Sequence, residues 1–231
     1  MDTPGANASQ ILKDATREDI LPPIFLFPED SHVNPQSWKF SDDKKYLEFC
    51  IAPSNKSTEI FLLLSNQICL ATQIDAILQT MEQRNDLIMG RLILFLYSPI
   101  LLDPPANFLN WLDGVTHFTD VLLFVSRSND TSAPIKDIQD RYQNMHYPME
   151  NYILAQKNNS WSRILDSTPR RISHVFDSPE LVEPENLPEN DRYLALLPTG
   201  ERKRTIPLVF SDTQTKSVSY THLTLPTTER V

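Results

Sequence analysis

Uninterrupted apolar runs separated by helical stripes are the dominant pattern in this chain. Residues 92–97 and 121–125 are almost entirely apolar, which is typical of strands buried on both faces rather than of half-exposed strands. Between them, residues 104–118 carry apolar side chains at helical spacing: Phe108, Trp111, Leu112, Val115 and Phe118. The pattern predicts a strand–helix–strand crossover unit of a parallel sheet.

Similar patterns extend on both sides of this unit. Residues 59–64 form another continuous apolar run, and residues 152–155 form a shorter one. Helical stripes follow two of the runs: Ile74, Ile77, Leu78 and Met81, and then Ile135, Ile138, Tyr142 and Met145. Short helices are predicted at residues 161–165 and 170–176. We therefore expect an α/β fold with one open, mainly parallel, doubly wound sheet of about four parallel strands, Rossmann-like or P-loop-like.

Antiparallel strands are expected at the edge of this sheet. Residues 38–40 and 46–51 flank the polar, turn-like cluster 41–44, and the second run alternates in polarity. Residues 24–27, which end at a proline, predict a short edge strand.

By composition the chain divides into five stretches. A polar N-terminal segment with a short helix precedes the α/β domain. An acidic, proline-rich linker without basic residues follows the domain, and two short apolar runs after it predict a hairpin or a docking segment. Residues 218–227 resemble a translated transposase sequencing adaptor, as in a metagenomic fragment, so we expect the last stretch to be a sequencing tail and the native C-terminus to be missing. The expected bounds are 1–22, 23–176, 177–191, 192–216 and 217–231.

Charge and hydropathy narrow the classes of function. With a net charge of −9, the chain is expected not to bind nucleic acid, because phosphate neutralisation needs clustered Lys and Arg. No apolar run reaches the ~18 residues of a membrane span, and the N-terminus lacks the features of a signal peptide. A cytoplasmic protein without a membrane partner is therefore expected. Cys50 and Cys69 lie in apolar runs without CxxC spacing, which predicts buried free thiols.

Glycine is scarce. The chain holds 4 glycines in 231 residues, whereas average usage predicts about 16. Loops that cradle phosphates need glycine where backbone amides approach a ligand or φ turns positive. Neither GxxxxGK[ST] nor GxGxxG occurs. We therefore expect no glycine-dependent nucleotide site and no cofactor.

Candidate ligand-binding residues follow the predicted parallel strands, because ligands of open parallel sheets bind beyond the carboxyl ends of the strands. The candidates are Ser65, Asn66, Ser98, Asp103, Ser126, Arg127 and Asn129. The cluster at residues 126–130 is the most polar and contains one cation. The alternative is that these Ser, Asn and Asp residues only cap helices and form turns.

No catalytic or metal-binding set is predicted. A nucleophile–His–acid set would need His117 and Asp120, but helical spacing places His117 on the solvent face, where pairing with Asp113 explains it. The histidines lack the spacing of metal ligands. The basic residues Arg163, Arg170, Arg171 and 202–204 could hold an anion, although pairing with the acidic linker is the more economical interpretation.

One family resemblance concerns the same segment. Residues 59–141 resemble the second half of a P-loop GTPase of the cobalamin-synthesis-W type, in which one strand ends in a metal-linked Asp and the next in Asn-Lys-x-Asp for guanine. Here Ser98 stands at the first position and residues 126–129 at the second. The phosphate loop and the Cys-x-Cys-Cys metal motif of that family are absent. The segment also resembles uncharacterised bacterial proteins in texture. The resemblance implies the architecture and a degenerate relative, not GTP hydrolysis.

Two hypotheses about function remain open. The first is a non-enzymatic interaction or scaffold module in which the acidic linker and residues 193–210 contact a protein partner. The second is a small-ligand or nucleotide-handling enzyme that uses Ser65, Ser98 and Arg127 at the carboxyl edge of the sheet. The scarcity of glycine and the lack of a catalytic set favour the first.

Overall fold

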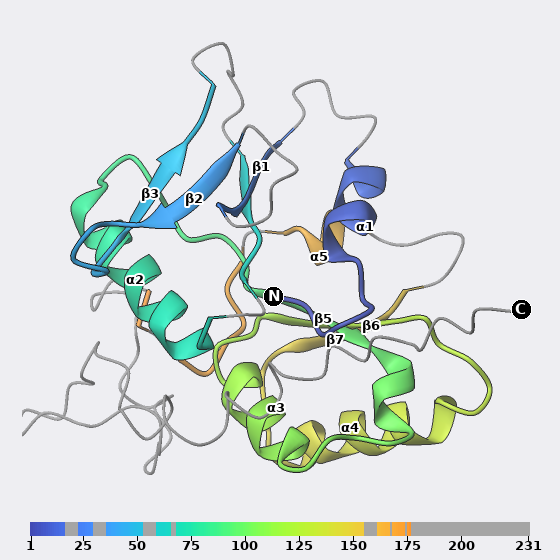
Figure 1. The fold of residues 1–231 in the computed structure, drawn as a ribbon. Helices are drawn as coiled ribbons and strands as arrows, with labels where there is room; N and C mark the ends of the chain where they lie inside the picture. Colours follow the sequence, from blue (N-terminus) through green and yellow to red (C-terminus); the bar gives the residue numbers. More distant parts are fainter. Residues whose placement is uncertain are drawn as a thin grey trace, which may run out of the picture.

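The strands of this protein form two sheets, as a computed structural model shows (Figure 1). The structure describes residues 1–16, 23–29, 36–52, 59–65, 68–154, 161–166, 168–173 and 175–176. The predicted linker, C-terminal segment and sequencing tail, residues 177–231, lie outside these stretches.

A three-stranded parallel sheet has the order β5–β6–β7. Its strands are β5 (Ile93–Tyr97), β6 (Val121–Val125) and β7 (Glu150–Ile153). The connections between them run through η1 (Ser98–Leu101), α3 (Phe108–Thr116) and α4 (Ser132–Asn144). The α/β fold class with mainly parallel pairing is confirmed, and so is the strand–helix–strand unit.

Both faces of this sheet are covered, which explains why its strands are apolar throughout. Leu122 and Phe124 of β6 join the core beneath α3 and α4. The alternate residues of β6 join the opposite core, beneath α1 (Ala8–Ala15) and α5 (Trp161–Ile164). Figure 1 shows the two pairs of helices on opposite sides of the sheet.

A second, mixed sheet has the order β3–β2–β1–β4. Its strands are β1 (Ile24–Pro28), β2 (Ser37–Phe40), β3 (Leu47–Cys50) and β4 (Ile60–Leu62). β1 pairs in parallel with β2 and β4, whereas β2 and β3 are antiparallel, which confirms the predicted hairpin. Ala76 and Ile77 of α2 (Leu70–Gln83) pack on this mixed sheet. Ile74 and Leu78 of the same helix join the core between the parallel sheet and helices α3 and α4.

Two predictions about strand placement are wrong. The run at residues 59–64 was expected in the sheet of residues 92–97, but β4 pairs with β1 instead. Residues 24–27 were expected at an edge, but β1 lies between β2 and β4. Pro28 is compatible with this interior position because its nitrogen lies on the side of β4, whose pairing with β1 ends at Leu26, whereas Phe27 and Glu29 donate to Gln36 and Trp38 on the other side.

The segment predicted as a helix over residues 170–176 is not helical in the residues described there. Instead it lies against the amino end of β6. The N–H of Arg170 donates to Asp120 Oδ1, and the guanidinium of Arg171 donates to Asp120 Oδ2 at 2.9 Å. The carboxylate also accepts the N–H of Leu92 at 2.7 Å. Contacts with a buried carboxylate therefore replace helical hydrogen bonds in this segment.

Two further expectations concern the burial of the cysteines and the lack of a membrane-spanning helix. No disulfide joins Cys50 and Cys69, but burial is wrong for Cys50, which is exposed at the end of β3. None of the helices in the described stretches is long and apolar enough to cross a membrane.

Candidate functional site

The predicted site residues belong to two sheets. Ser98 and Ser126 directly follow β5 and β6, whose last residues pair, so they share the carboxyl edge of the parallel sheet with Arg127. Ser65 follows β4 in the other sheet. Asn66 lies outside the described residues. Strand pairing therefore groups Ser98, Ser126 and Arg127, but not Ser65.

The main chain of Ser65 is held by a buried glutamine. Its N–H donates to Gln73 Oε1 at 2.7 Å, and its carbonyl accepts from Gln73 Nε2 at 2.9 Å. The same amide donates to the carbonyl of Ile68. Gln73 thereby ties the main chain of Ser65 and of Ile68 to α2, a role for which the sequence carries no signal.

Two further candidates lie around η1. Ser98, its first residue, is fully buried, and its hydroxyl oxygen has no hydrogen-bond partner in the described part of the chain. A buried hydroxyl without a partner is uncommon in folded proteins. Asp103 follows η1 and is exposed.

The cluster after β6 forms the entry to α4. Ser126 adopts a φ of 58°, a left-handed conformation that is uncommon for a residue other than glycine. Ser128 and Thr131 bond reciprocally through their N–H groups and hydroxyls, and the carbonyl of Asn129 accepts the N–H of Ser132. These bonds form a turn before α4, whose N-cap residue is Thr131 and which has no side-chain cap bond, so they agree with the turn alternative for Ser128 and Asn129.

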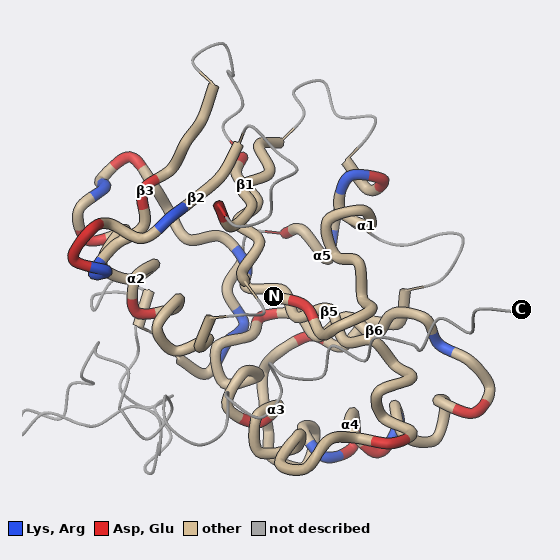
Figure 2. The backbone as a smooth tube through the Cα atoms, in the orientation of Figure 1, with Lys and Arg blue, Asp and Glu red and all other residues tan. Residues whose placement is uncertain are grey.

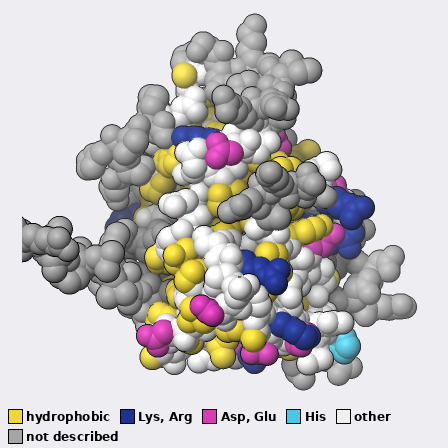
Figure 3. Space-filling view, turned by 90° about the vertical axis from the view of Figure 1, so that its right-hand side faces the viewer, with side chains coloured by type: hydrophobic (Ala, Val, Ile, Leu, Met, Phe, Trp, Pro, Cys, Tyr) yellow, Lys and Arg dark blue, Asp and Glu magenta, His cyan; other side chains and the backbone are white. Residues whose placement is uncertain are grey.

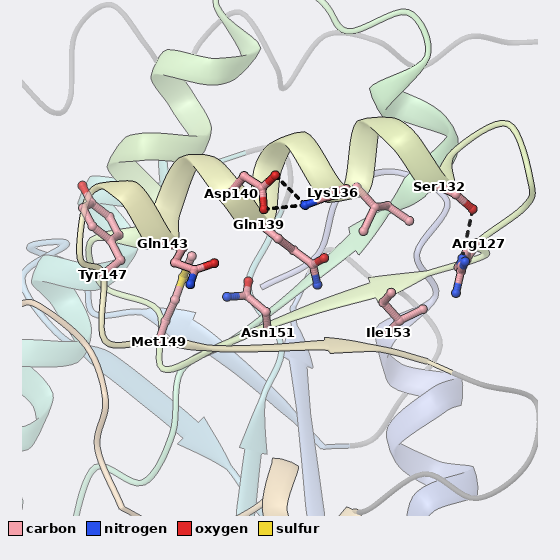
Figure 4. A pocket seen from close by; sticks show the side chains of 11 residues that line it. Arg127, Ser132, Lys136, Gln139, Asp140, Gln143, Tyr147, Met149, Asn151 and Ile153 are labelled. Carbon is pink, nitrogen blue, oxygen red and sulfur yellow. Dashed lines mark hydrogen bonds and ion pairs between the residues drawn. The ribbon is translucent and has the colours of Figure 1, made fainter.

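Arg127 projects from this entry into a groove between α4 and β7, which we call the α4–β7 groove (Figure 4). Its volume is about 600 Å³, and Arg127 lies at one end of it. The apolar side chains of Ile135, Met149 and Ile153 line part of the groove. The amide side chains of Gln139, Gln143 and Asn151 line the gap between the helix and the strand.

The charges in the groove are unequally neutralised. Lys136 and Asp140 form an ion pair along α4, with 2.7 Å between Nζ and Oδ2. Arg127 donates from Nε to the Ser132 hydroxyl at 3.2 Å and forms no ion pair with any described residue. The Oδ1 atom of Asn151 is buried and accepts no hydrogen bond within the described stretches. The groove thus offers one cation that no described residue neutralises.

A side-chain clamp sets the position of α4, which forms one wall of the groove. Asp113 of α3 accepts from Arg141 Nη2 at 2.6 Å and from the Tyr142 hydroxyl at 3.1 Å. Burial raises the pKa of the Tyr142 hydroxyl, which therefore stays protonated and remains a donor. The two helices are joined by three hydrogen bonds to the Asp113 carboxylate, two from Arg141 and one from Tyr142.

The solvent position predicted for His117 is wrong. The residue is 4% exposed, and its ring packs edge-on against Phe118. His117 keeps helical dihedral angles, so the spacing itself holds, but a distant segment reaches this side of the helix: the N–H of Ser173 donates to the His117 carbonyl at 3.1 Å. His117 and Asp120 precede β6, so they lie at the end of the sheet opposite to Ser98 and Ser126.

Sequence reasoning missed an ionic cluster at this amino end. The side chain of Arg91 is 3% exposed and donates to Glu150 Oε2 at 2.9 Å. It also donates to the carbonyls of Arg163 and Thr168 at 2.7 and 3.0 Å. An arginine directly before an apolar run is the one signal that the sequence offered. The cluster fastens residues 161–168 to the sheet.

What this site could bind or catalyse is inferred from the positions of its side chains. Within the stretches described, no three His, Cys, Asp or Glu side chains are grouped so that they could hold a metal ion. Comparison of the chain with protein-family models, curated proteins and solved structures found no match.

Proposed function

We propose that this protein is a non-catalytic α/β interaction module and that the α4–β7 groove is its binding surface. The composition of the groove carries the proposal. Its walls combine apolar and amide side chains, and the one carboxylate among its described lining residues, Asp140, is neutralised by Lys136. Such a lining suits recognition through apolar contact and hydrogen bonds more than acid–base chemistry.

We propose that the main ligand of this module is another protein. The acidic linker and residues 192–216 would add contacts, although both lie outside the described stretches. Both acidic and basic residues occur along α4 in Figure 2, and charges of both signs are interspersed on the face seen in Figure 3. Mixed charge of this kind supports neither a nucleic-acid partner nor an anionic membrane surface. We further propose a cytoplasmic location and a degenerate P-loop-type ancestry.

One observation favours an alternative function, a small-ligand or nucleotide-handling enzyme. Arg127 follows a parallel strand at the carboxyl edge, where ligands of such sheets bind. The neighbouring strand β5 is followed directly by Ser98, whose buried hydroxyl has no partner among the described residues. Arg127 would give an anionic ligand a cation at this edge of the sheet.

Thermal unfolding distinguishes the two functions. We expect no shift of the melting temperature with millimolar GTP, ATP or phosphorylated metabolites, because an interaction module binds none of them. An enzyme site would instead stabilise the chain by RT ln(1 + [L]/Kd), about 2.7 kcal/mol at a ligand concentration of 100 Kd. A shift that disappears in Arg127→Ala but persists in Arg84→Ala, an exposed arginine at the end of α2, would establish the alternative.

A further inference from the structure

We propose that the α4–β7 groove binds an extended internal segment of another protein, which adds as a strand to β7 and places an acidic side chain against Arg127. The inference rests on the proposed function and names its ligand. It is carried by the free edge of β7, the lining of the groove and the position of its cation.

The main chain of β7 is available on one side. β7 is the outer strand of its sheet, and no described strand pairs with its other edge. The N–H groups of Glu150 and Leu154 donate to β6 residues or their flank, at 2.9 and 2.8 Å. Main-chain groups of a strand point alternately to its two sides, so those of Asn151 and Ile153 point away from β6. They present donors and acceptors to an added strand.

Side chains of the same strand residues line the groove. Asn151 and Ile153 of β7, and Met149 directly before it, alternate along the chain and all face α4 (Figure 4). A peptide paired with β7 would direct every second side chain into the space beneath α4. The groove is bounded by helix α4 on one side and by the edge of strand β7 on the other. This arrangement favours an extended ligand over a helical one.

The charge of the groove selects the ligand chemistry. Since Lys136 is neutralised by Asp140, the remaining charge is the guanidinium of Arg127 at one end. A carboxylate there would form a charge-assisted hydrogen bond. An acidic side chain within the segment supplies this carboxylate whichever direction the added strand runs, whereas a chain terminus would reach Arg127 in one direction only.

The test begins with random peptides displayed on phage and selected on the full chain. The enriched sequence is then synthesised with an acetylated N-terminus and an amidated C-terminus, and its affinity is measured by fluorescence anisotropy. Single N-methylation along the peptide removes one main-chain donor at a time. For an added strand, we expect losses of about tenfold or more at alternate residues and little change between them.

A double-mutant cycle tests the contact between Arg127 and the acidic side chain of the peptide. Arg127→Gln should weaken binding about tenfold, and the peptide's own Glu→Gln change should cost little more in that background. Arg84→Gln serves as the matched control, because this exposed arginine lies at the end of α2 and is paired with Asp86. Its binding should equal that of the unaltered protein.

The other outcomes contradict the inference at separate levels. Binding at the groove with N-methyl losses at helical spacing, or a requirement for a free C-terminal carboxylate, would overturn the strand mode and leave the interaction module standing. Displacement of the selected peptide by synthetic residues 192–210 would identify this chain itself as the occupant. Concentration-dependent dimerisation lost in Ile153→Lys would identify a second copy. If no peptide binds the groove, the inference and the proposed binding surface both fail.

Discussion

Replacing Asp120 with asparagine is expected to lower the free energy of unfolding by about 3 kcal/mol, because breaking a buried ion pair leaves an uncompensated charge in the core. Asp120 is fully buried and accepts hydrogen bonds from Leu92, Arg170 and Arg171. The guanidinium of Arg171 is buried as well, with a side chain 1% exposed. Asparagine would deprive that cation of its counter-charge. Urea denaturation followed by circular dichroism measures the difference.

Two further variants separate the buried pair from a general effect of charge. Asp86→Asn removes an exposed carboxylate that binds Arg84 at 2.6 Å, and it should leave stability unchanged. Asp120→Leu combined with Arg171→Met removes both charges and should recover much of the loss, because a buried pair is often replaceable by apolar residues. If Asp120→Asn and Asp86→Asn changed the free energy of unfolding equally, Asp120 would not anchor the segment that contains Arg170 and Arg171.

The sequence predicts local elements of this fold well and the partners of its strands poorly. Strands β5 and β6 and helix α3 follow from apolar spacing, because burial on two faces or on one stripe leaves a local pattern. The run that forms β4 has the same local pattern, yet it pairs with β1 in the other sheet. Pairing depends on packing between distant segments, and periodicity contains no information about it.

The candidate site divides in a similar way. Arg127 was predicted because it follows a buried strand, a position that the topology of parallel sheets singles out. The groove residues on α4 and β7 were not predicted. Gln139 of α4 and Asn151 of β7 are isolated polar residues without a motif. Asp120 and Arg171 were missed as a pair for a related reason. Their contact spans 51 positions of the chain, and each residue alone resembles an ordinary surface charge.

Replacing either of two adjacent leucines in β6 is expected to destabilise the protein by about 3–5 kcal/mol. Leu122 and Leu123 are both fully buried, but they belong to the cores on opposite faces of the sheet. Alanine at either position would open a cavity beneath α3 and α4 or beneath α1 and α5. Chemical denaturation of Leu122→Ala and Leu123→Ala measures both losses, with Leu109→Ala as the control because Leu109 of α3 is 44% exposed. If one substitution cost no more than the control, that face of the sheet would be open to solvent. The continuous apolar run would then have another cause than burial on two sides.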